Sequence, residues 1–254
     1  MNILITGCSS GFGYVGAIYL ARKGHKIYAT MRNLKKNKFK HKNITVLKLD
    51  VNDKKSISRV LSKIKKLDVL INNAGYVQAG LFEDLSEKDI REQMETNFFG
   101  VFNVTKTFLP LLKKSKKAKI INMSSISGKV SSPGLSAYSA SKFALEAMSE
   151  SMKFEFKNID VHLIEPGPYN TQIFKENLEI AVPKNKGLYN KIMQYTTKSI
   201  NNDVEAIPRL INKIINGKKG FRHPIGPGNY YYARKYLPFS WVEWGIKSLM
   251  KKFS

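Results

Sequence analysis

The sequence predicts a doubly wound, mostly parallel α/β sheet of six to seven strands, with helices on both faces. Two observations carry this prediction. An apolar strand at residues 2–6 leads into a glycine-rich turn and then into a predicted helix, which is how a parallel βα unit begins. Residues 67–71 form a nearly continuous apolar run, as expected for a parallel strand covered by helices on both faces. The length fits one domain, residues 1–254.

The first half of the chain contains four predicted strands. The helix after the first strand covers residues 13–24 and ends at Gly24, a residue type that favours helix C-caps. A basic amphipathic helix covers residues 53–66. The four strands cover residues 2–6, 26–30, 44–51 and 67–71. The segment from Asn72 to Gly75 then turns at the carboxyl end of the fourth strand, where ligands bind in such sheets.

The second half continues the alternation of helices and strands. Ser86 and Asp89 have a spacing like that of a capping box and begin a long helix that reaches towards Pro110. Apolar residues at helical spacing predict another helix from Ser136 onwards. The remaining predictions are strands at 119–125 and 161–165, a helix at 203–216 and a short, weak seventh strand at 221–225.

Composition limits the kind of protein. The net charge of +24 would suit nucleic acid, anionic lipid or an acidic carrier protein. The lysines are scattered over many segments, however, so we favour a solvated surface and do not expect nucleic acid. The single cysteine, Cys8, excludes an internal disulfide and fits a reducing cytoplasm; it is interpreted as a small filler. No apolar run reaches membrane-spanning length, so a soluble, cytoplasmic protein is expected. The four histidines have no ligand spacing, and no metal is expected.

Three stretches carry residue types suited to chemistry. Gly7, Gly11 and Gly13 permit a tight turn whose backbone N–H groups can approach a pyrophosphate at a helix N-terminus. Tyr138 and Lys142 lie four residues apart on one helix face. An ammonium beside a phenol favours the phenolate and lowers its pKa, which suits acid–base work.

A serine supplies a third candidate group. Ser124 or Ser125, at the end of the strand at 119–125, can donate a hydrogen bond to a substrate carbonyl. The alternative is an ordinary hydroxyl that caps a turn, which the following Ser127 and Gly128 also favour.

Together these motifs resemble the single-domain short-chain dehydrogenase/reductase family. The likeness rests on Thr-Gly-x-x-x-Gly-x-Gly from Thr6, Asn-Asn-Ala-Gly from Asn72, Ser125 thirteen residues before Tyr138, and Tyr-x-x-x-Lys from Tyr138. It covers at least Asn2 to Thr171. It implies a Rossmann-type fold and an enzyme that interconverts an alcohol and a carbonyl. The patterns at 6–11 and 28–32 are similar to the NADP-preferring hydroxysteroid/retinol dehydrogenase-like branch.

The resemblance also implies roles for individual residues. Ser125 and Tyr138 would hydrogen-bond the substrate oxygen, and Tyr138 would transfer a proton. Lys142 would keep the pKa of Tyr138 low and bind the nicotinamide ribose, and Asn97 would support a proton-relay water. The implied cofactor-binding residues are Gly7, Ser9, Ser10, Gly11, Phe12, Gly13, Arg32, Asp50, Val51, Asn73, Ala74, Gly75, Tyr138, Lys142, Pro166, Gly167 and Thr171. The aliphatic residue that is usual between the last two positions is replaced by Tyr169.

The end of the second strand indicates which cofactor is used. A carboxylate there would bind the ribose hydroxyls of NAD, whereas an arginine accommodates the 2′-phosphate of NADP. This chain has Arg32 and no acidic residue until Asp50, and Ser10 supplies a further hydroxyl. NADP(H) is therefore the predicted cofactor.

The expected substrate is a lipophilic small-molecule alcohol or carbonyl, because apolar residues fill a predicted lid at 172–200. The enzyme alternative is a 3-oxoacyl-carrier-protein reductase, and the alternative of another class is a non-enzymatic NADP(H) sensor or nucleic-acid binder. The resemblance suggests a homodimer or homotetramer that pairs through the helices containing Asn97 and Tyr138. The amphipathic tail at 230–254 has three candidate roles: packing against protein, peripheral membrane contact, or covering the substrate pocket.

Overall fold

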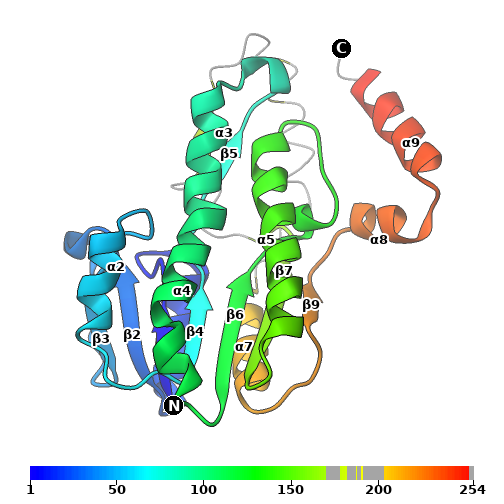
Figure 1. Cartoon of the computed structure of the whole chain (residues 1–254). Helices are drawn as coiled ribbons and strands as arrows, with labels where there is room; N and C mark the ends of the chain where they lie inside the picture. Colours follow the sequence, from blue (N-terminus) through cyan, green and yellow to red (C-terminus); the bar gives the residue numbers. More distant parts are fainter. Residues whose placement is uncertain (170–177, 182–186, 188–189, 191–202, 252–254) are drawn as a thin grey trace.

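The computed structural model describes residues 1–169, 178–181, 187, 190 and 203–251. Its main sheet has seven parallel strands in the order β3-β2-β1-β4-β6-β7-β9, as Figure 1 shows. The strands are β1 Asn2–Ile5, β2 Lys26–Met31, β3 Ile44–Lys48, β4 Val69–Asn72, β6 Ala118–Met123, β7 Ile159–Pro166 and β9 Arg222–Ile225. The predicted doubly wound class is confirmed, and the weak run at 221–225 is indeed the seventh strand.

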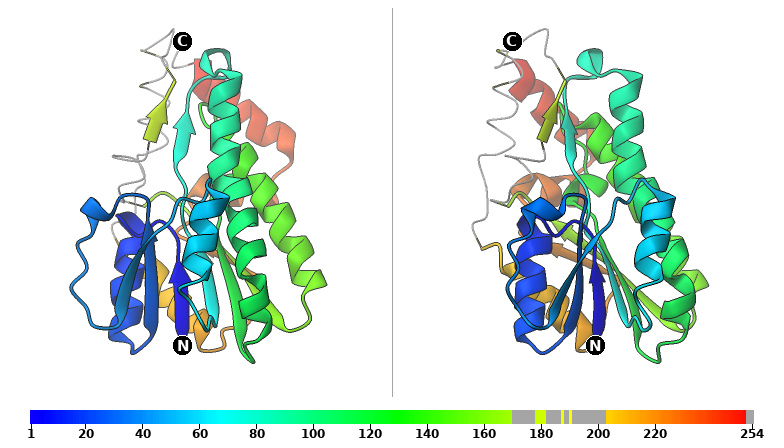
Figure 2. Two further views of the ribbon diagram at one scale, coloured as in Figure 1. Left: turned by 60° about the vertical axis from the view of Figure 1, so that its left-hand side comes forward. Right: turned by 90° about the vertical axis from the view of Figure 1, so that its left-hand side faces the viewer.

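Helices cover both faces of this sheet (Figure 2). One face packs against α1 and α7, and the other packs against α2, α4 and α5. Their bounds are α1 Gly11–Arg22, α2 Lys54–Leu61, α4 Gly100–Lys113, α5 Ser136–Glu155 and α7 Ala206–Ile215. Side chains alternate between the faces, since Ile3 and Ile5 lie in the first core and Leu4 lies in the second.

The predicted long helix before Pro110 has three parts. It begins with α3, Glu87–Met94, and the predicted capping box forms between Ser86 and Asp89. A π-helical turn, Glu95–Phe99, follows and joins α3 to α4. Asn97 lies in this turn, and π-helical turns often occur at functional sites.

Several elements differ from the prediction. Helix α2 ends at Leu61 instead of residue 66. A two-stranded sheet of β5, Val77–Ala79, and β8, Leu178–Ile180, was not predicted, because three residues are too few to show a period. The tail forms two helices, α8 Asn229–Tyr236 and α9 Phe239–Lys251. Short helical turns lie at Leu34–Lys36, Phe82–Asp84 and Ile126–Gly128. Within the described ranges, no helix is long and apolar enough to cross a bilayer.

Candidate active site

The glycine-rich turn after β1 is held against the loop after β4. The Thr6 hydroxyl accepts from the backbone N–H groups of Asn73 and Ala74, both at 2.9 Å. Asn73 Nδ2 donates to the carbonyl oxygens of Thr6 and Gly7 at 2.9 and 3.1 Å. Gly7 has φ +71°, and a Cβ there would lie 2.8 Å from Ala74 Cα. The contact therefore requires glycine, and the side chain of Asn73 faces the turn.

The start of α1 lies on this same turn. A Cβ on Gly13 would overlap the Gly7 carbonyl oxygen and would lie 2.6 Å from Asn73 Nδ2. Ser10 is the N-cap of α1, but its hydroxyl makes no capping hydrogen bond within the described part of the chain. The first turn of α1 also contains no acidic residue. The N-terminus of α1 therefore has neither a side-chain cap nor an acidic neighbour, so it can accept an anionic group such as a pyrophosphate.

Cys8 is enclosed in this region. It is fully buried, and its Sγ donates to the Ile5 carbonyl at 3.3 Å. Burial raises the pKa of the thiol to about 12, so the thiolate is not formed at neutral pH. The thiol is therefore a filler, as the sequence predicted.

The hydroxyl groups of Ser125 and Tyr138 meet at the carboxyl end of β6. Ser125 Oγ accepts from Ser127 N–H at 3.1 Å and contacts the Pro166 carbonyl at 3.5 Å. The Ser125 hydroxyl also lies near the Tyr138 phenol and lowers the pKa of Tyr138. Burial outweighs this effect and raises the pKa of Tyr138 to about 12. Ser125 thus caps a turn and faces Tyr138, whereas the Ser124 hydroxyl is buried without a hydrogen bond in the described residues.

The surroundings of Lys142 differ from the prediction that its ammonium lowers the pKa of Tyr138. Its Nζ donates to the Met123 carbonyl at 2.8 Å and lies 5.7 Å from the centre of the Tyr138 ring. Burial lowers the pKa of Lys142 to about 8. We predicted that this ammonium lowers the pKa of Tyr138, but the pKa of Tyr138 is raised. The helical spacing is right, yet burial disfavours the charged form of both groups, and the ammonium is directed to a carbonyl.

Asn97 joins α5 to the loop after β4. Its Oδ1 accepts from Tyr76 N–H at 3.2 Å, and its Nδ2 donates to the Tyr76 carbonyl and to Ser141 Oγ, both at 3.1 Å. Ser141 Oγ in turn donates to the Tyr138 carbonyl at 2.7 Å. A Cβ on Gly75 would lie 3.0 Å from Asn97 Oδ1 and 3.8 Å from Lys142 Nζ. Asn97 therefore lies beside the Tyr138 and Lys142 pair and fixes its backbone.

The residues predicted for the adenosine end are spread along the same edge of the sheet. Arg32 is exposed directly after β2. One carboxyl oxygen of Asp50 accepts from Asn52 N–H at 3.0 Å. Val51 is buried, and a Cβ on Gly100 would lie 2.8 Å from its Cγ2. Val51 thus packs against α4.

The residues predicted for the nicotinamide end follow β7. A Cβ on Gly167 would overlap the Gly226 carbonyl, so two loops touch there. Tyr169 is buried and its ring meets the edge of Phe12 with centroids 5.4 Å apart. This contact accounts for the tyrosine in place of an aliphatic residue. Thr171 and most of the predicted lid at 172–200 lie outside the described residues.

The sequence analysis missed a partly buried ionic cluster beneath the Ser125 turn. Arg222 of β9 pairs with Glu146, with Glu165 at 3.1 Å and with Glu150 at 2.9 Å. A Cβ on Gly128 would lie 2.8 Å from Glu146 Cγ, so the cluster packs directly against the turn. The sequence gives one hint of this cluster, since Glu146 lies one helical turn after Lys142. The pairing itself could not be predicted, because Arg222 comes from a strand far along the chain.

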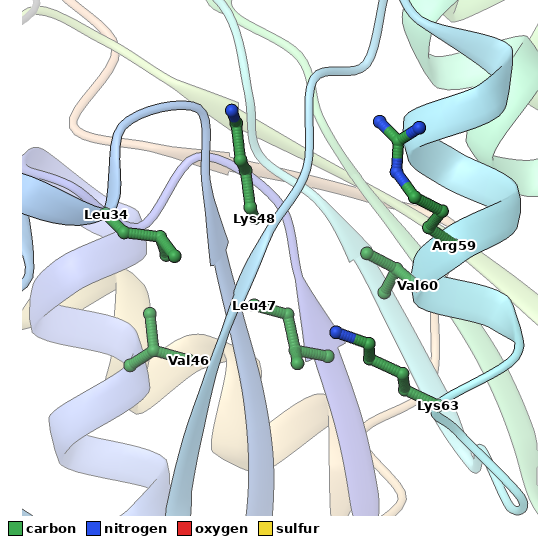
Figure 3. A pocket seen from close by; sticks show the side chains of 7 residues that line it. All are labelled: Leu34, Val46, Leu47, Lys48, Arg59, Val60 and Lys63. Atoms are coloured by element: carbon green, nitrogen blue, oxygen red, sulfur yellow. The ribbon is translucent and has the colours of Figure 1, made fainter.

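A separate pocket lies beside β3 (Figure 3). Its lining consists of Leu34, Val46, Leu47, Lys48, Arg59, Val60 and Lys63. None of the predicted site residues lines it. Within the described ranges, no group of three or more His, Cys, Asp or Glu side chains is placed to hold a metal ion.

The strand order and the glycine-rich turn define a Rossmann-type dinucleotide-binding protein. The sequence profile of the short chain dehydrogenase family matches residues 1–180. An uncharacterized oxidoreductase of Bacillus subtilis, YusZ, is 37% identical over 98% of this chain and 96% of its own length. A 3-ketodihydrosphingosine reductase of Bacteroides thetaiotaomicron is 42% identical over 70% of this chain and 67% of its own.

A solved short-chain dehydrogenase from Streptomyces avermitilis superposes with a TM-score of 0.81. It is 27% identical and covers 98% of this chain and 96% of its own. The chain belongs to the short-chain dehydrogenase family. It is an oxidoreductase that acts on alcohol and carbonyl groups.

Proposed function

We propose that the protein interconverts a lipophilic alcohol and the corresponding carbonyl with NADP(H), using Ser125, Tyr138, Lys142 and Asn97. One observation carries the proposal: Ser125, Tyr138 and Lys142 are buried together, with the Ser125 hydroxyl near the Tyr138 phenol and Lys142 Nζ 5.7 Å from the Tyr138 ring. Two neighbouring hydroxyls can both donate a hydrogen bond to the oxygen of one substrate. A serine and a tyrosine donor then stabilise the negative charge that forms on that oxygen.

The site residues suit the reducing direction. A bound nicotinamide dinucleotide supplies the hydride. With its pKa at about 12, Tyr138 holds its proton at neutral pH and can donate it to the oxygen of a carbonyl that is being reduced. Lys142, with a pKa of about 8, is charged in most molecules at pH 7 and offers a cation next to the tyrosine. Asn97 keeps the helix that carries both residues in place through Ser141.

Three features of β1, α1, β2 and the segment that follows β2 support a dinucleotide cofactor and a preference for NADP(H). The close packing of Gly7 and Gly13 leaves no side chain over the uncapped start of α1. Cys8 N–H donates to the Thr30 carbonyl at 2.7 Å, which ties the end of β2 to the turn, and Arg32 follows two residues later. No acidic residue lies between Thr30 and Asp50 to repel a 2′-phosphate.

Fold alone leaves the choice between NADP and NAD open. A short-chain dehydrogenase from Burkholderia cenocepacia, 21% identical, was solved with NADP, and one from Burkholderia phymatum, 19% identical, with NAD. We therefore test Arg32 directly. Arg32→Asp should lower kcat/KM for NADPH by at least about tenfold relative to NADH, because a charge-assisted phosphate contact is lost. Lys36→Asp removes a nearby exposed cation and is the matched control. Equal loss in both variants would contradict the assignment of Arg32.

The apolar surroundings of Tyr138 support a lipophilic substrate. Tyr138 packs in a small cluster with Val77, Ala79 and Leu135, against which Leu178 of β8 also lies. The printed names of two relatives agree: the 3-ketodihydrosphingosine reductase and human retinol dehydrogenase 8, which is 38% identical over 67% of this chain and 60% of its own. The likeness to the retinol dehydrogenase-like branch is part of the same proposal.

We also infer that copies of the chain pair through α4 and α5. Phe99 at the end of the π-helical turn, Phe102 of α4 and Phe143 of α5 are each more than 40% exposed. A second copy would cover these rings. Sedimentation of the purified protein checks the expected dimer or tetramer.

The central test is NADPH oxidation with a panel of lipophilic ketones and aldehydes, with a 3-oxoacyl carrier-protein substrate as one arm. Tyr138→Phe should abolish turnover and leave NADPH binding nearly intact, because it removes only the transferable proton. A variant that still turns over would remove Tyr138 from the mechanism. A salt-dependent nucleic-acid binding assay on the same protein tests the non-enzymatic alternative.

A further inference from the structure

The two tail helices expose a group of aromatic side chains. Helices α8 and α9 extend away from the sheet and its covering helices (Figure 1). Trp241 and Trp244 are 66% and 74% exposed, and the neighbouring Tyr236 and Phe239 are 69% and 58% exposed. Single exposed apolar residues are ordinary, but several within nine positions form a patch that indicates an interaction surface. We call Tyr236, Leu237, Phe239, Trp241 and Trp244 the aromatic patch.

The patch lies on a different face of α9 from the stripe seen in the sequence. That stripe begins with Val242 and Ile246, and Val242 is buried while Ile246 is half-buried. Trp241 and Trp244 are three residues apart and share a face of the helix. The described part of the stripe therefore packs against the protein, whereas the two tryptophans are exposed and can contact a partner. An amphipathic helix with a single apolar face does not describe α9.

Cations surround the aromatic patch. Arg234 lies over the Phe239 ring at 5.0 Å, and Lys235 lies over the Tyr236 ring at 5.0 Å. Lys247 pairs with Glu243 at 2.7 Å, and Glu243 is the single acidic residue in the sequence from 229 to 251. Tryptophan and tyrosine rings beside Lys and Arg are the composition of the membrane interface, where rings enter the headgroup layer and cations meet anionic lipid.

A second copy of the chain suits this surface less well. An isologous contact through the patch would bring Arg234 and Lys235 of both copies together. Like charges brought together at that local contact would repel each other. An anionic bilayer reverses the sign of that interaction.

We propose that the aromatic patch binds peripherally to the surface of an anionic lipid bilayer. The tail begins four residues after β9, at the same edge of the parallel sheet where Ser125 and Tyr138 lie. Binding through the tail would therefore turn the active-site edge towards the lipid. That orientation rests on the proposed lipophilic substrate, but the membrane contact does not.

The chain provides its own probe for the test. Its two tryptophans are both in the patch, so intrinsic tryptophan fluorescence reports on α9 alone. We expect vesicles of phosphatidylcholine and phosphatidylglycerol to shift the emission to the blue and to reduce quenching by acrylamide. The effect should weaken with added salt and with vesicles of phosphatidylcholine only. Cofactor and substrate are left out, so failure of the proposed oxidoreductase function would not affect the result.

Variants connect the binding to the patch. Trp241→Ser combined with Trp244→Ser should lower the vesicle partition coefficient, measured by co-sedimentation, by at least about tenfold, since two large rings leave the interface. Phe154→Ser is the matched control: Phe154 is 79% exposed, near the end of α5, which runs back towards the opposite edge of the sheet. It should bind like the wild type. Thermal unfolding checks that each variant is folded.

Three results would overturn the proposal. The first is a double tryptophan variant that sediments with vesicles as well as the control does. The second is wild-type emission that is blue-shifted without lipid and unchanged by vesicles, which would show that protein already covers the rings. Emission that depends on protein concentration but not on lipid would assign the patch to a second copy of the chain.

Discussion

The contacts of Asn97 allow its role to be separated from general stability. Asn97→Ala removes three hydrogen bonds and leaves the Tyr76 N–H without its acceptor. An orphaned buried donor costs about 1–3 kcal/mol, and each lost neutral hydrogen bond about 0.5–1.5 kcal/mol. Tyr76 O still accepts from Gln93, so we expect a loss of about 2–4 kcal/mol in the free energy of unfolding. For a chain of this size this lowers Tm by roughly 5–15 °C.

Gln93 provides the matched control. It is also fully buried, its Nε2 donates to the same Tyr76 carbonyl at 3.1 Å, and its Oε1 accepts from Gln78 N–H at 2.7 Å. Gln93→Ala should therefore lower Tm by a similar amount. Its contacts lie on the β5 side, however, whereas Asn97 also bonds Ser141, which holds the Tyr138 carbonyl.

The two variants should therefore differ in catalysis. A displacement of about 1 Å at reacting groups can cost about 10²-fold in rate. We expect kcat to fall by about that factor in Asn97→Ala and by only a few-fold in Gln93→Ala. Differential scanning fluorimetry gives the two Tm values, and NADPH oxidation with a ketone that the wild type reduces gives kcat. Similar falls in kcat for both variants would refute the reasoning, because Asn97 would then act only through stability.

Three further predictions follow from single contacts. Gly13→Ala should abolish NADPH binding in a fluorescence titration, because its Cβ meets Asn73 Nδ2 at 2.6 Å. Gly16→Ala has open space around the Cβ and should bind NADPH normally and gain up to about 1 kcal/mol of stability; equal binding by both variants would contradict this. Burial lowers the pKa of Lys142 to about 8 from an unfolded value of 10.5, so its contribution to stability is present above the unfolded pKa and is lost as pH falls through the folded one. The Tm of Lys142→Met minus that of the wild type should therefore increase as pH falls from about 10 to about 7. A Tm difference that does not change with pH would count against a buried ammonium. Arg222→Met removes a cation from the buried carboxylates of Glu146 and Glu165, while Lys129 stays 3.7 Å from Glu146, so the cost should lie near the lower end of about 3–5 kcal/mol. Burial raises the pKa of Glu165 to about 7 from an unfolded value of 4.5. Its contribution to stability is therefore fully present below the unfolded pKa and is lost as pH rises through about 7. The loss in Arg222→Met should therefore be greater near pH 8 than near pH 5, and an equal loss at both would exclude Glu165 as the cause.

Much of the fold was predictable because its signals are local. A parallel strand covered on both faces must be apolar throughout, and residues 67–71 show this in the sequence alone. The capping box of Ser86 and Asp89 is likewise a short-range pattern, and it forms as predicted. The three-residue strands β5 and β8 carry no period and could not be predicted.

The sequence by itself determined the sheet, the turn at Gly7 to Gly13 and the presence of a tyrosine and a lysine on one face of a helix. Only the tertiary structure decided what those groups contact. Arg222 reaches Glu146 and Glu165 from a strand far along the chain, and Lys142 reaches the Met123 carbonyl instead of the Tyr138 phenol. The direction of each pKa shift follows from this packing, because desolvation depends on atoms that come from distant segments and is invisible in any local pattern.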